Sequence, residues 1–218
     1  MTMLVPQPLT AAAFAPYGRV LQVPADGAGG QPINAGTTQR FELLADAQLT
    51  VEGGRPVLSI SRAQARQLPM ALVEMERHAL GSQSFVPLGA ARRLVLVVAP
   101  PGPAPRGWSD LTAFVSDGAQ GVWLAPGTWH HPLLALEAGD FLVVERRGAA
   151  VDCDVVALQP PVWLAARSGS KGWTVPAPTS LCATRWRACS APRACCPRRS
   201  SWCARATAWS CCRTRMRR

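Results

Sequence analysis

The sequence predicts an all-β domain, an antiparallel sandwich or barrel, followed by a tail of different character. Short runs of β-type residues follow one another from about residue 19 to residue 158, and turn residues separate nearly all of them. Almost no helical periodicity lies between these runs. Strands joined directly by turns favour an antiparallel architecture over one in which strands and helices alternate.

One short helix is expected before the strands. Thr10 precedes the run Ala11 to Ala15 and can serve as its N-cap, and Pro16 and Gly18 end the helix. Ten expected strands follow, and turns such as Ala125-Pro126-Gly127 separate them. Their ranges are 19–23, 33–43, 56–62, 72–78, 84–88, 93–99, 121–124, 130–136, 140–146 and 153–158.

The charge of the chain is distributed unevenly. All 218 residues together carry a formal charge of +10, which taken alone would suggest a polyanionic partner. Residues 1–160, however, hold 11 basic and 13 acidic residues and carry −2, whereas the last 58 residues hold 12 basic residues, no acidic one, and carry +12. We therefore predict one globular domain over residues 1–160 and a separate tail over residues 161–218.

The tail is rich in Arg, Cys and Trp and contains seven of the eight cysteines. It could be a basic arm that binds nucleic-acid phosphates, a zinc module, or a stretch that was never selected to fold. Its cysteines include the adjacent pairs Cys195-Cys196 and Cys211-Cys212, and it has no histidine, which speaks against zinc. The composition is typical of out-of-frame translation of a GC-rich gene, so we expect a disordered tail and no nucleic-acid partner.

The domain is large enough to bury its own core. Its longest apolar run, Leu94 to Pro101, is far shorter than the roughly 20 residues of a membrane-spanning helix. The first ten residues contain no Lys or Arg and two prolines, unlike a secretory signal. Cys153 is the only cysteine of residues 1–160, which fits a reducing compartment. We expect a cytoplasmic protein with no membrane partner.

The expected strand over residues 72–78 places several chemically active side chains together. Successive side chains of a strand alternate between its faces, so Glu74, Glu76 and His78 share one face, and Val73 and Met75 share the other. The corner at Gly81-Ser82 then folds the chain back and can bring Gln83 close to His78.

A second group follows the turn at Pro126-Gly127. His130 and His131 are adjacent, so on a strand they must face opposite sides, and His130 can face the interior. Together with Glu76, His78 and Gln83 it would offer imidazole and oxygen ligands for Ni, Mn, Fe or Zn. Without a metal the same groups could act as an acid and a base. Structural histidines and a solvated acidic face are the alternatives.

Arg62 ends the apolar run that starts at Val57. A guanidinium at the end of such a strand can hold an anion such as a substrate carboxylate. A surface ion pair is the alternative. Motifs for nucleotide binding, for serine hydrolases and for H-E-x-x-H metalloproteases are missing from the sequence, which excludes those classes.

Two blocks resemble the ureidoglycolate lyase family, formerly called ureidoglycolate hydrolases. They are Glu76 to Leu88, which reads ERHALGSQSFVPL, and Gly127 to Leu133, which reads GTWHHPL. Further agreement, in unbroken order over about residues 3–160, comes from the blocks 14–18, 33–36, 59–63, 118–122 and 140–146.

The resemblance implies a cupin-like antiparallel β-barrel of the jelly-roll type. It also implies a homodimer that cleaves (S)-ureidoglycolate to glyoxylate and urea in allantoin breakdown. A first cupin motif usually supplies two histidines and a glutamate, and here Glu76 and Gln83 occupy two of those three places. A non-catalytic cupin that binds a small carboxylate as a sensor is the alternative function.

With this resemblance, the candidate site can be stated residue by residue. Arg62 is expected to hold the substrate carboxylate, with Asn34 and Trp129 as further substrate contacts. The expected catalytic residues, which are also the candidate ligands of a divalent ion such as Ni, Mn or Zn, are Glu76, His78, Gln83 and His130. The two histidines either bind the ion, to which the substrate hydroxyl and carboxylate chelate, or act directly as base and acid.

Overall fold

The structure, a computed structural model, describes residues 3–44, 46–89 and 91–166. These residues belong to one compact unit, Met1–Lys171. Most of the expected tail, from residue 167 onwards, lies outside the described residues. The expectation that the tail is disordered therefore concerns residues that the structure does not describe. The domain boundary expected at residue 160 falls inside the last strand, β15 (Asp154–Leu164), which pairs with β7 (Met70–Arg77) on both sides of residues 158–161.

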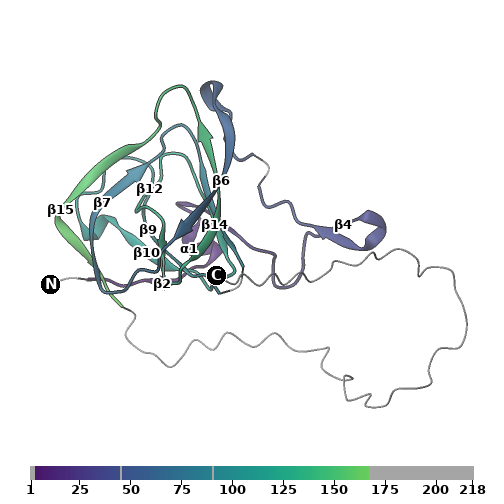
Figure 1. Ribbon diagram of the computed structural model, residues 1–218, viewed down its shortest axis with the longest axis horizontal. Helices are drawn as coiled ribbons and strands as arrows, with labels where there is room; N and C mark the ends of the chain where they lie inside the picture. The colour runs from purple at the N-terminus through teal and green to yellow at the C-terminus, as the bar shows by residue number, and fades with distance from the viewer. Residues whose placement is uncertain (1–2, 45, 90, 167–218) are drawn as a thin grey trace, which may run out of the picture. The chain divides into compact units, whose positions relative to one another are not determined.

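Two large sheets make up the domain (Figure 1). The first sheet has eight strands. Seven of them follow one another in the order β1-β15-β7-β12-β9-β10-β2, and the eighth, β13, pairs with β9. Besides β15 and β7, its strands are β1 (Met3–Leu4), β12 (Trp129–His130), β9 (Leu94–Ala99), β10 (Thr112–Val115), β2 (Gln7–Pro8) and β13 (Leu134–Ala135). The second has five strands in the order β3 (Gly18–Leu21), β11 (Gly121–Leu124), β8 (Gln83–Leu88), β14 (Gly139–Arg147) and β6 (Arg55–Ala63). Neighbours are antiparallel except for the short pairs β1–β15 and β2–β10. The prediction of an all-β fold is confirmed.

The expected N-terminal helix is present as α1 (Ala11–Phe14). The Thr10 hydroxyl accepts a hydrogen bond from the Ala13 amide at 3.2 Å, which confirms the predicted N-cap. Phe14 is fully buried, and its ring contacts that of Phe114 edge to face, with centroids 5.5 Å apart. The helix is therefore fixed to the core by one aromatic side chain. Short 3-10 turns occur at Val51–Gly53 and Trp108–Asp110.

Two ranges that were each expected to form one continuous strand are interrupted in the structure. The range 33–43 is a hairpin of β4 (Gln31–Ile33) and β5 (Thr38–Arg40) with its own two-stranded sheet, because Asn34, Ala35 and Gly36 have positive φ and reverse the chain. The range 130–136 is divided into β12 and β13. Pro132 lies between them and has no amide hydrogen for the ladder.

Strand β9 has a core on both of its faces. Leu94, Leu96 and Val98 pack with residues of the second sheet such as Phe85 and Phe141. The alternate residues of β9 pack on the other side of the first sheet, against a cluster that includes Leu72, Met75 and Trp129. The space between the two sheets is thus the side to which Val98 points, and a residue paired beside Val98 shares that side.

The expected alternation along β7 holds only from Met75 onwards. Met75 is buried as predicted, but Val73 is 55% exposed and Leu72 is fully buried. Val73 and Glu74 are both exposed, so the alternation is interrupted there. At the same place the register with β15 shifts, and four residues of β15 between Ala157 and Val162 oppose the single residue Val73. Glu76 keeps its expected side.

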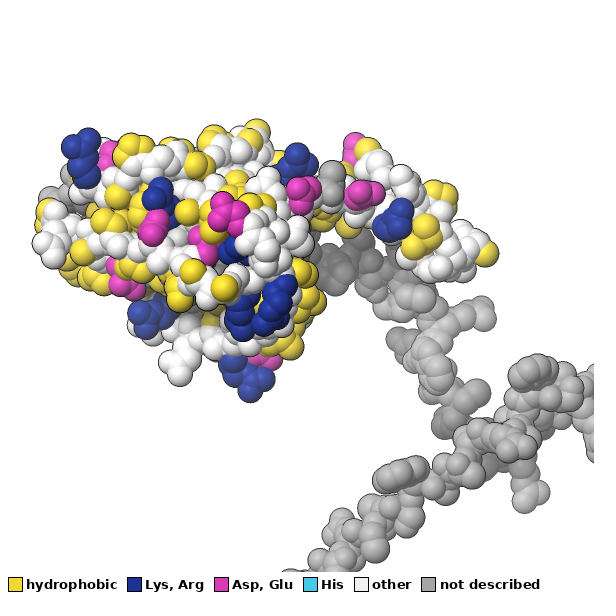
Figure 2. Space-filling view, turned by 90° about the horizontal axis from the view of Figure 1, so that it is seen from above, with side chains coloured by type: hydrophobic (Ala, Val, Ile, Leu, Met, Phe, Trp, Pro, Cys, Tyr) yellow, Lys and Arg dark blue, Asp and Glu magenta, His cyan; other side chains and the backbone are white. Residues whose placement is uncertain are grey.

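The domain surface carries mixed charges. On the face shown in Figure 2, acidic and basic side chains are interspersed with apolar ones, and no histidine is visible. Among the described residues there is no helix with the length and apolar character needed to cross a membrane.

Candidate active site

Glu76, His78 and His130 converge between the two sheets. Glu76 on β7 pairs directly with His130 on β12, and His130 also pairs with Val98, whose side chain faces the inter-sheet core. His78 follows the last residue of β7. One ligand atom from each of the three residues lies within 4.8 Å of the others. The sequence-predicted residues Glu76, His78 and His130 are therefore brought together by the fold.

Both histidines are oriented by backbone carbonyl groups. The Nδ1 of His130 lies 2.9 Å from the Thr128 carbonyl oxygen, and the Nδ1 of His78 contacts the Asp152 carbonyl oxygen. A carbonyl can only accept, so each Nδ1 carries a hydrogen, and in the neutral form of each ring the lone pair then lies on Nε2. Neither Nε2 has a hydrogen-bond partner, although both atoms are buried. The His130 Nε2 lies 3.4 Å from a Glu76 carboxylate oxygen.

Gln83 contributes a third buried acceptor. Its Nε2 donates to the Glu145 carboxylate at 3.1 Å, and its Oε1 has no partner. Gln83 and Glu145 are paired residues of β8 and β14, each two positions from an inter-sheet core residue, Phe85 and Val143. Both side chains therefore point into the space that His130 faces. Among the described residues, the buried side-chain polar atoms without a partner are the Nε2 atoms of His78 and His130 and the Oε1 of Gln83.

These donor atoms fit a divalent metal ion. An unpaired buried acceptor costs about 1–3 kcal/mol, and here two lone pairs lie near a carboxylate without a proton between them. A cation would offset this repulsion. Two imidazole nitrogens with carboxylate and amide oxygens are the donor set of borderline ions such as Ni, Mn, Fe or Zn. The three unpaired atoms belong to three of the four residues that the sequence proposes as ligands.

The Glu76 carboxyl is ionised at neutral pH. Burial acts to raise its pKa. When protonated, however, His130 can donate to the carboxylate from Nε2, and the positive charges that His130, His78 and His131 then carry outweigh burial, so the pKa of Glu76 lies below its usual value. His131 is different, because burial lowers its pKa more than its hydrogen bond to the Pro132 carbonyl raises it. Near neutral pH the cluster thus contains an anionic carboxylate, and His131, which lies outside the cluster, is neutral.

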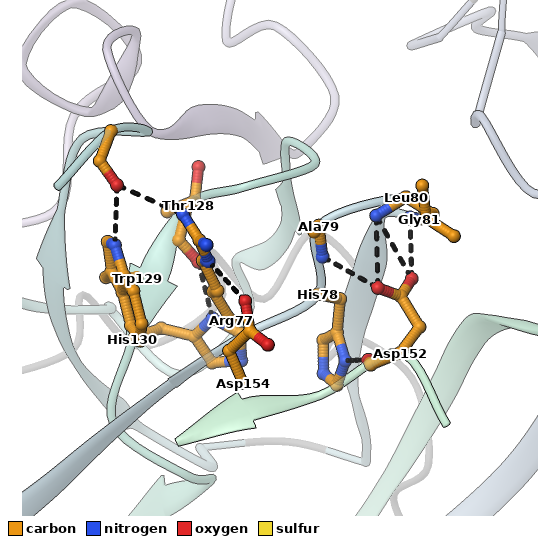
Figure 3. A network of polar contacts seen from close by, with 11 residues as sticks. Arg77, His78, Ala79, Leu80, Gly81, Thr128, Trp129, His130, Asp152 and Asp154 are labelled. Carbon is orange, nitrogen blue, oxygen red and sulfur yellow. Dashed lines mark hydrogen bonds and ion pairs between the residues drawn. The ribbon is translucent and has the colours of Figure 1, made fainter. Parts of the chain in front are cut away.

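Asp152 holds the corner that presents His78, as Figure 3 shows. Its carboxylate accepts hydrogen bonds from the amides of Ala79 at 2.8 Å, Leu80 at 3.1 Å and Gly81 at 2.9 Å, while its backbone carbonyl accepts from His78. Sequence reasoning missed Asp152. It lies more than 70 positions from the corner, and no local motif marks it.

Replacing Asp152 with alanine is expected to lower the free energy of unfolding by about 2 kcal/mol, because three corner amides lose their acceptor. The buried Arg146, 3.8 Å from the Asp152 carboxylate, would lose its ion pair as well. Urea denaturation measures the change. Asp154→Ala is the control, because its surface pair with Arg77 contributes about 0–1 kcal/mol. Equal losses in the two variants would contradict this role of Asp152.

The other predicted site residues lie elsewhere. Arg62 makes the surface ion pair, with two hydrogen bonds to Asp140 at 2.8 and 3.0 Å, and its side chain is 84% exposed. Asn34 is exposed in the β4–β5 turn. Trp129 is buried in the core on the opposite side of β12 from His130, where its indole donates to the Gly102 carbonyl at 3.2 Å. The structure does not bring these three residues to the Glu76–His78–His130 cluster.

A cavity of about 320 Å³ adjoins the cluster. His78 lines it from one side, and Glu145, Arg146, Arg147 and residues 148–153 line the rest. Its volume suits a small metabolite rather than a polymer. Glu145, like Asp152, was not singled out as a site residue from the sequence. The available signal was alternation along β14: Phe141 and Val143 face the core between the sheets, and Glu145, two positions further on, shares their side.

Comparison with known proteins bears directly on this site. The family whose description is "Ureidoglycolate lyase" matches residues 1–165, which include every residue of the cluster and its cavity. A ureidoglycolate lyase of Burkholderia cepacia is 48% identical over 152 residues, 69% of this chain and 84% of that protein. One from Burkholderia mallei is 47% identical over 165 residues, 75% of this chain and 94% of that protein. One from Pseudomonas syringae pv. syringae is 46% identical over 156 residues, 71% of this chain and 89% of that protein.

A solved structure of RmlC from Streptococcus suis in complex with dTDP-D-xylose gives a TM-score of 0.32 at 14% identity, over 56% of this chain and 62% of that one. A similarity at that level carries no argument about function. The family match covers about three quarters of the chain, and the relatives align over most of their own length. The sequence resemblance is therefore confirmed, and the chain belongs to the ureidoglycolate lyase family.

Proposed function

We propose that this protein is a carbon–nitrogen lyase that cleaves (S)-ureidoglycolate to glyoxylate and urea, in the cytoplasm and as a step of allantoin breakdown. The observation that supports it most is the convergence of Glu76, His78 and His130 beside a small cavity, in a chain whose family match spans that whole site. The relatives compared above all bear the name of this enzyme. Those names do not favour the alternative of a non-catalytic carboxylate sensor.

The reaction requires one proton to move within the substrate. Ureidoglycolate carries a hydroxyl and a ureido nitrogen on the same carbon. The O–H bond breaks, the C–O bond becomes the aldehyde of glyoxylate, the C–N bond breaks, and the ureido nitrogen receives a proton and leaves as urea. No water is consumed. The site must therefore accept a proton at one position and return it at another.

The residues of the cluster can perform these tasks. We propose that His78 and His130 through Nε2, Gln83 through Oε1 and Glu76 through one carboxylate oxygen hold a divalent ion. When bound, the ion would stabilise negative charge developing on the substrate oxygen. The second oxygen of Glu76, which is ionised at neutral pH, accepts the hydroxyl proton and passes it to the ureido nitrogen. Without an ion, the Nε2 of His130 would accept the hydroxyl proton as the base, and His78, protonated on Nε2 before the reaction, would give a proton to the ureido nitrogen as the acid.

The test is turnover of racemic ureidoglycolate by the full-length protein. We expect glyoxylate and urea in equal amounts, with half of the racemate consumed. Binding of ureidoglycolate without release of either product would contradict the enzyme and favour the sensor.

We also propose a homodimer, as the family resemblance implies. A candidate contact is the outer side of β6, the edge strand of the second sheet, where Leu58 is 67% and Ile60 is 65% exposed. Large exposed side chains on one edge mark an interaction surface.

Ile60→Asp is expected to convert the dimer to a monomer, because a carboxylate would be buried in the contact without a partner. Light scattering coupled to size exclusion measures the mass. Val155→Asp, a change at a side chain that is 60% exposed on another strand, should leave the mass unchanged. An unaltered dimer in the Ile60 variant would place the contact on another surface.

A further inference from the structure

We infer that Glu145 is a positioning residue: its carboxylate turns the amide of Gln83 so that the Gln83 oxygen faces the cluster of Glu76, His78 and His130. This inference rests on the proposed function and its divalent ion. It assigns a role to Glu145, a residue that neither the motifs nor the alternation of charged residues had singled out.

The Glu145 carboxylate sets the orientation of the Gln83 amide. Gln83 and Glu145 are paired across β8 and β14, and the Gln83 Nε2 lies 3.1 Å from the Glu145 Oε2. A carboxylate can only accept hydrogen bonds, so it selects the amide nitrogen for its side. The opposite amide orientation would place two oxygen atoms against each other. Glu145 thus directs the Gln83 Oε1 away from itself.

The Gln83 oxygen has no hydrogen-bond donor in this orientation. Gln83 is 8% exposed, and its Oε1 is buried without a hydrogen-bond donor. In the part of the chain that the structure describes, the Nε2 atoms of His78 and His130 share this condition. The amide oxygen belongs to the same set of unpaired acceptors, and a positive ion is the partner that such a set requires.

Each of the three residues with an unpaired acceptor is oriented by a second group. The Asp152 carbonyl orients His78, the Thr128 carbonyl orients His130, and the Glu145 carboxylate orients Gln83. Such partners fix the direction and strengthen the basicity of a metal ligand. Among these three, only the group of Glu145 belongs to a side chain, so substitution can remove it without changing the backbone.

Glu145→Gln is the informative variant because it keeps the size of the side chain. A glutamine at this position can donate or accept, so the Gln83 amide can turn around and still form a hydrogen bond. We expect the affinity of the metal-free full-length protein for Ni²⁺, measured by calorimetry, to fall by about 10- to 100-fold. Arg147→Gln is the matched control. It removes the contact that Arg147 makes with the other Glu145 oxygen at 3.4 Å and leaves the Gln83 bond in place, so the affinity should change by no more than about twofold.

A double-variant cycle with Gln83→Ala separates positioning from simple loss of charge. Gln83→Ala alone removes the proposed ligand oxygen and should weaken Ni²⁺ binding by at least as much as Glu145→Gln. If Glu145 acts through Gln83, adding Glu145→Gln to Gln83→Ala weakens binding no further.

An undiminished effect of Glu145→Gln in the Gln83→Ala background would overturn the inference, because Glu145 would then act on the ion by its charge. Unchanged affinity in Glu145→Gln itself would overturn it too. Turnover of ureidoglycolate by the unaltered protein is scored separately, so in either case the proposed function would stand. Absence of any Ni²⁺ binding by the unaltered protein would overturn the inference and remove this ion from the mechanism.

Discussion

Replacing His130 with alanine is expected to abolish urea release while leaving the fold intact. His130 is 2% exposed and pairs with Glu76, so its imidazole supplies either a ligand of the ion or the proton acceptor of a metal-free reaction. Both roles require Nε2, the atom that has no other partner. Loss of such a group lowers turnover by about 10²- to 10⁴-fold. Initial rates of urea and glyoxylate release measure the loss.

His131→Ala is the matched control for this experiment. His131 is the neighbouring imidazole, but its Nδ1 contacts the Pro132 carbonyl at 2.8 Å, and it is not a member of the cluster. Its replacement should leave turnover within a few-fold. Circular dichroism and thermal melting show whether each variant folds. A folded His130→Ala protein with near-normal turnover would remove His130 from the mechanism under either assignment.

Local sequence patterns predicted the strand content well, because burial of alternating side chains leaves a regular trace. Strands β6, β7, β8 and β14 each lie within about two residues of an expected range. The patterns failed where backbone conformation decides the structure. The positive φ of Asn34 and Ala35 turns an expected strand into a hairpin, and neither residue requires that conformation. Strand β10 (Thr112–Val115) was not among the expected strands.

Part of the candidate site could be predicted from the sequence, because the alternation of side chains along a strand indicates which residues share a face. Glu76 and His130 lie on strands, and alternation together with the Pro126-Gly127 turn indicated which side each faces. The remaining groups act over long sequence separations. Asp152 reaches the amides of residues 79–81, and Glu145 lies 62 positions from Gln83, so only the folded sheets bring them together. Arg62 is a further example, because its partner Asp140 lies 78 positions away and becomes its neighbour only when β6 and β14 pair.

Removal of divalent ions by a strong chelator is expected to abolish turnover and to lower the melting temperature. The chelator would leave the Nε2 atoms of His78 and His130 buried without a partner beside the Glu76 carboxylate. An ion present at about 100 times its dissociation constant stabilises the folded state by about 2.7 kcal/mol. For a domain of this size that corresponds to a decrease of about 5–10 °C on removal.

Re-addition of ions one at a time then identifies the metal. Ni²⁺, Mn²⁺ and Zn²⁺ are added separately to the chelated protein, and both melting temperature and urea release are recorded. The His130→Ala protein serves as the control, because with one imidazole ligand removed its melting temperature should respond far less to chelator. Full turnover by the chelated, unaltered protein would contradict the metal-bound arrangement. Direct proton transfer would then require His130, whose Nε2 lies 3.4 Å from the Glu76 carboxylate, as the base and His78, protonated on Nε2, as the acid.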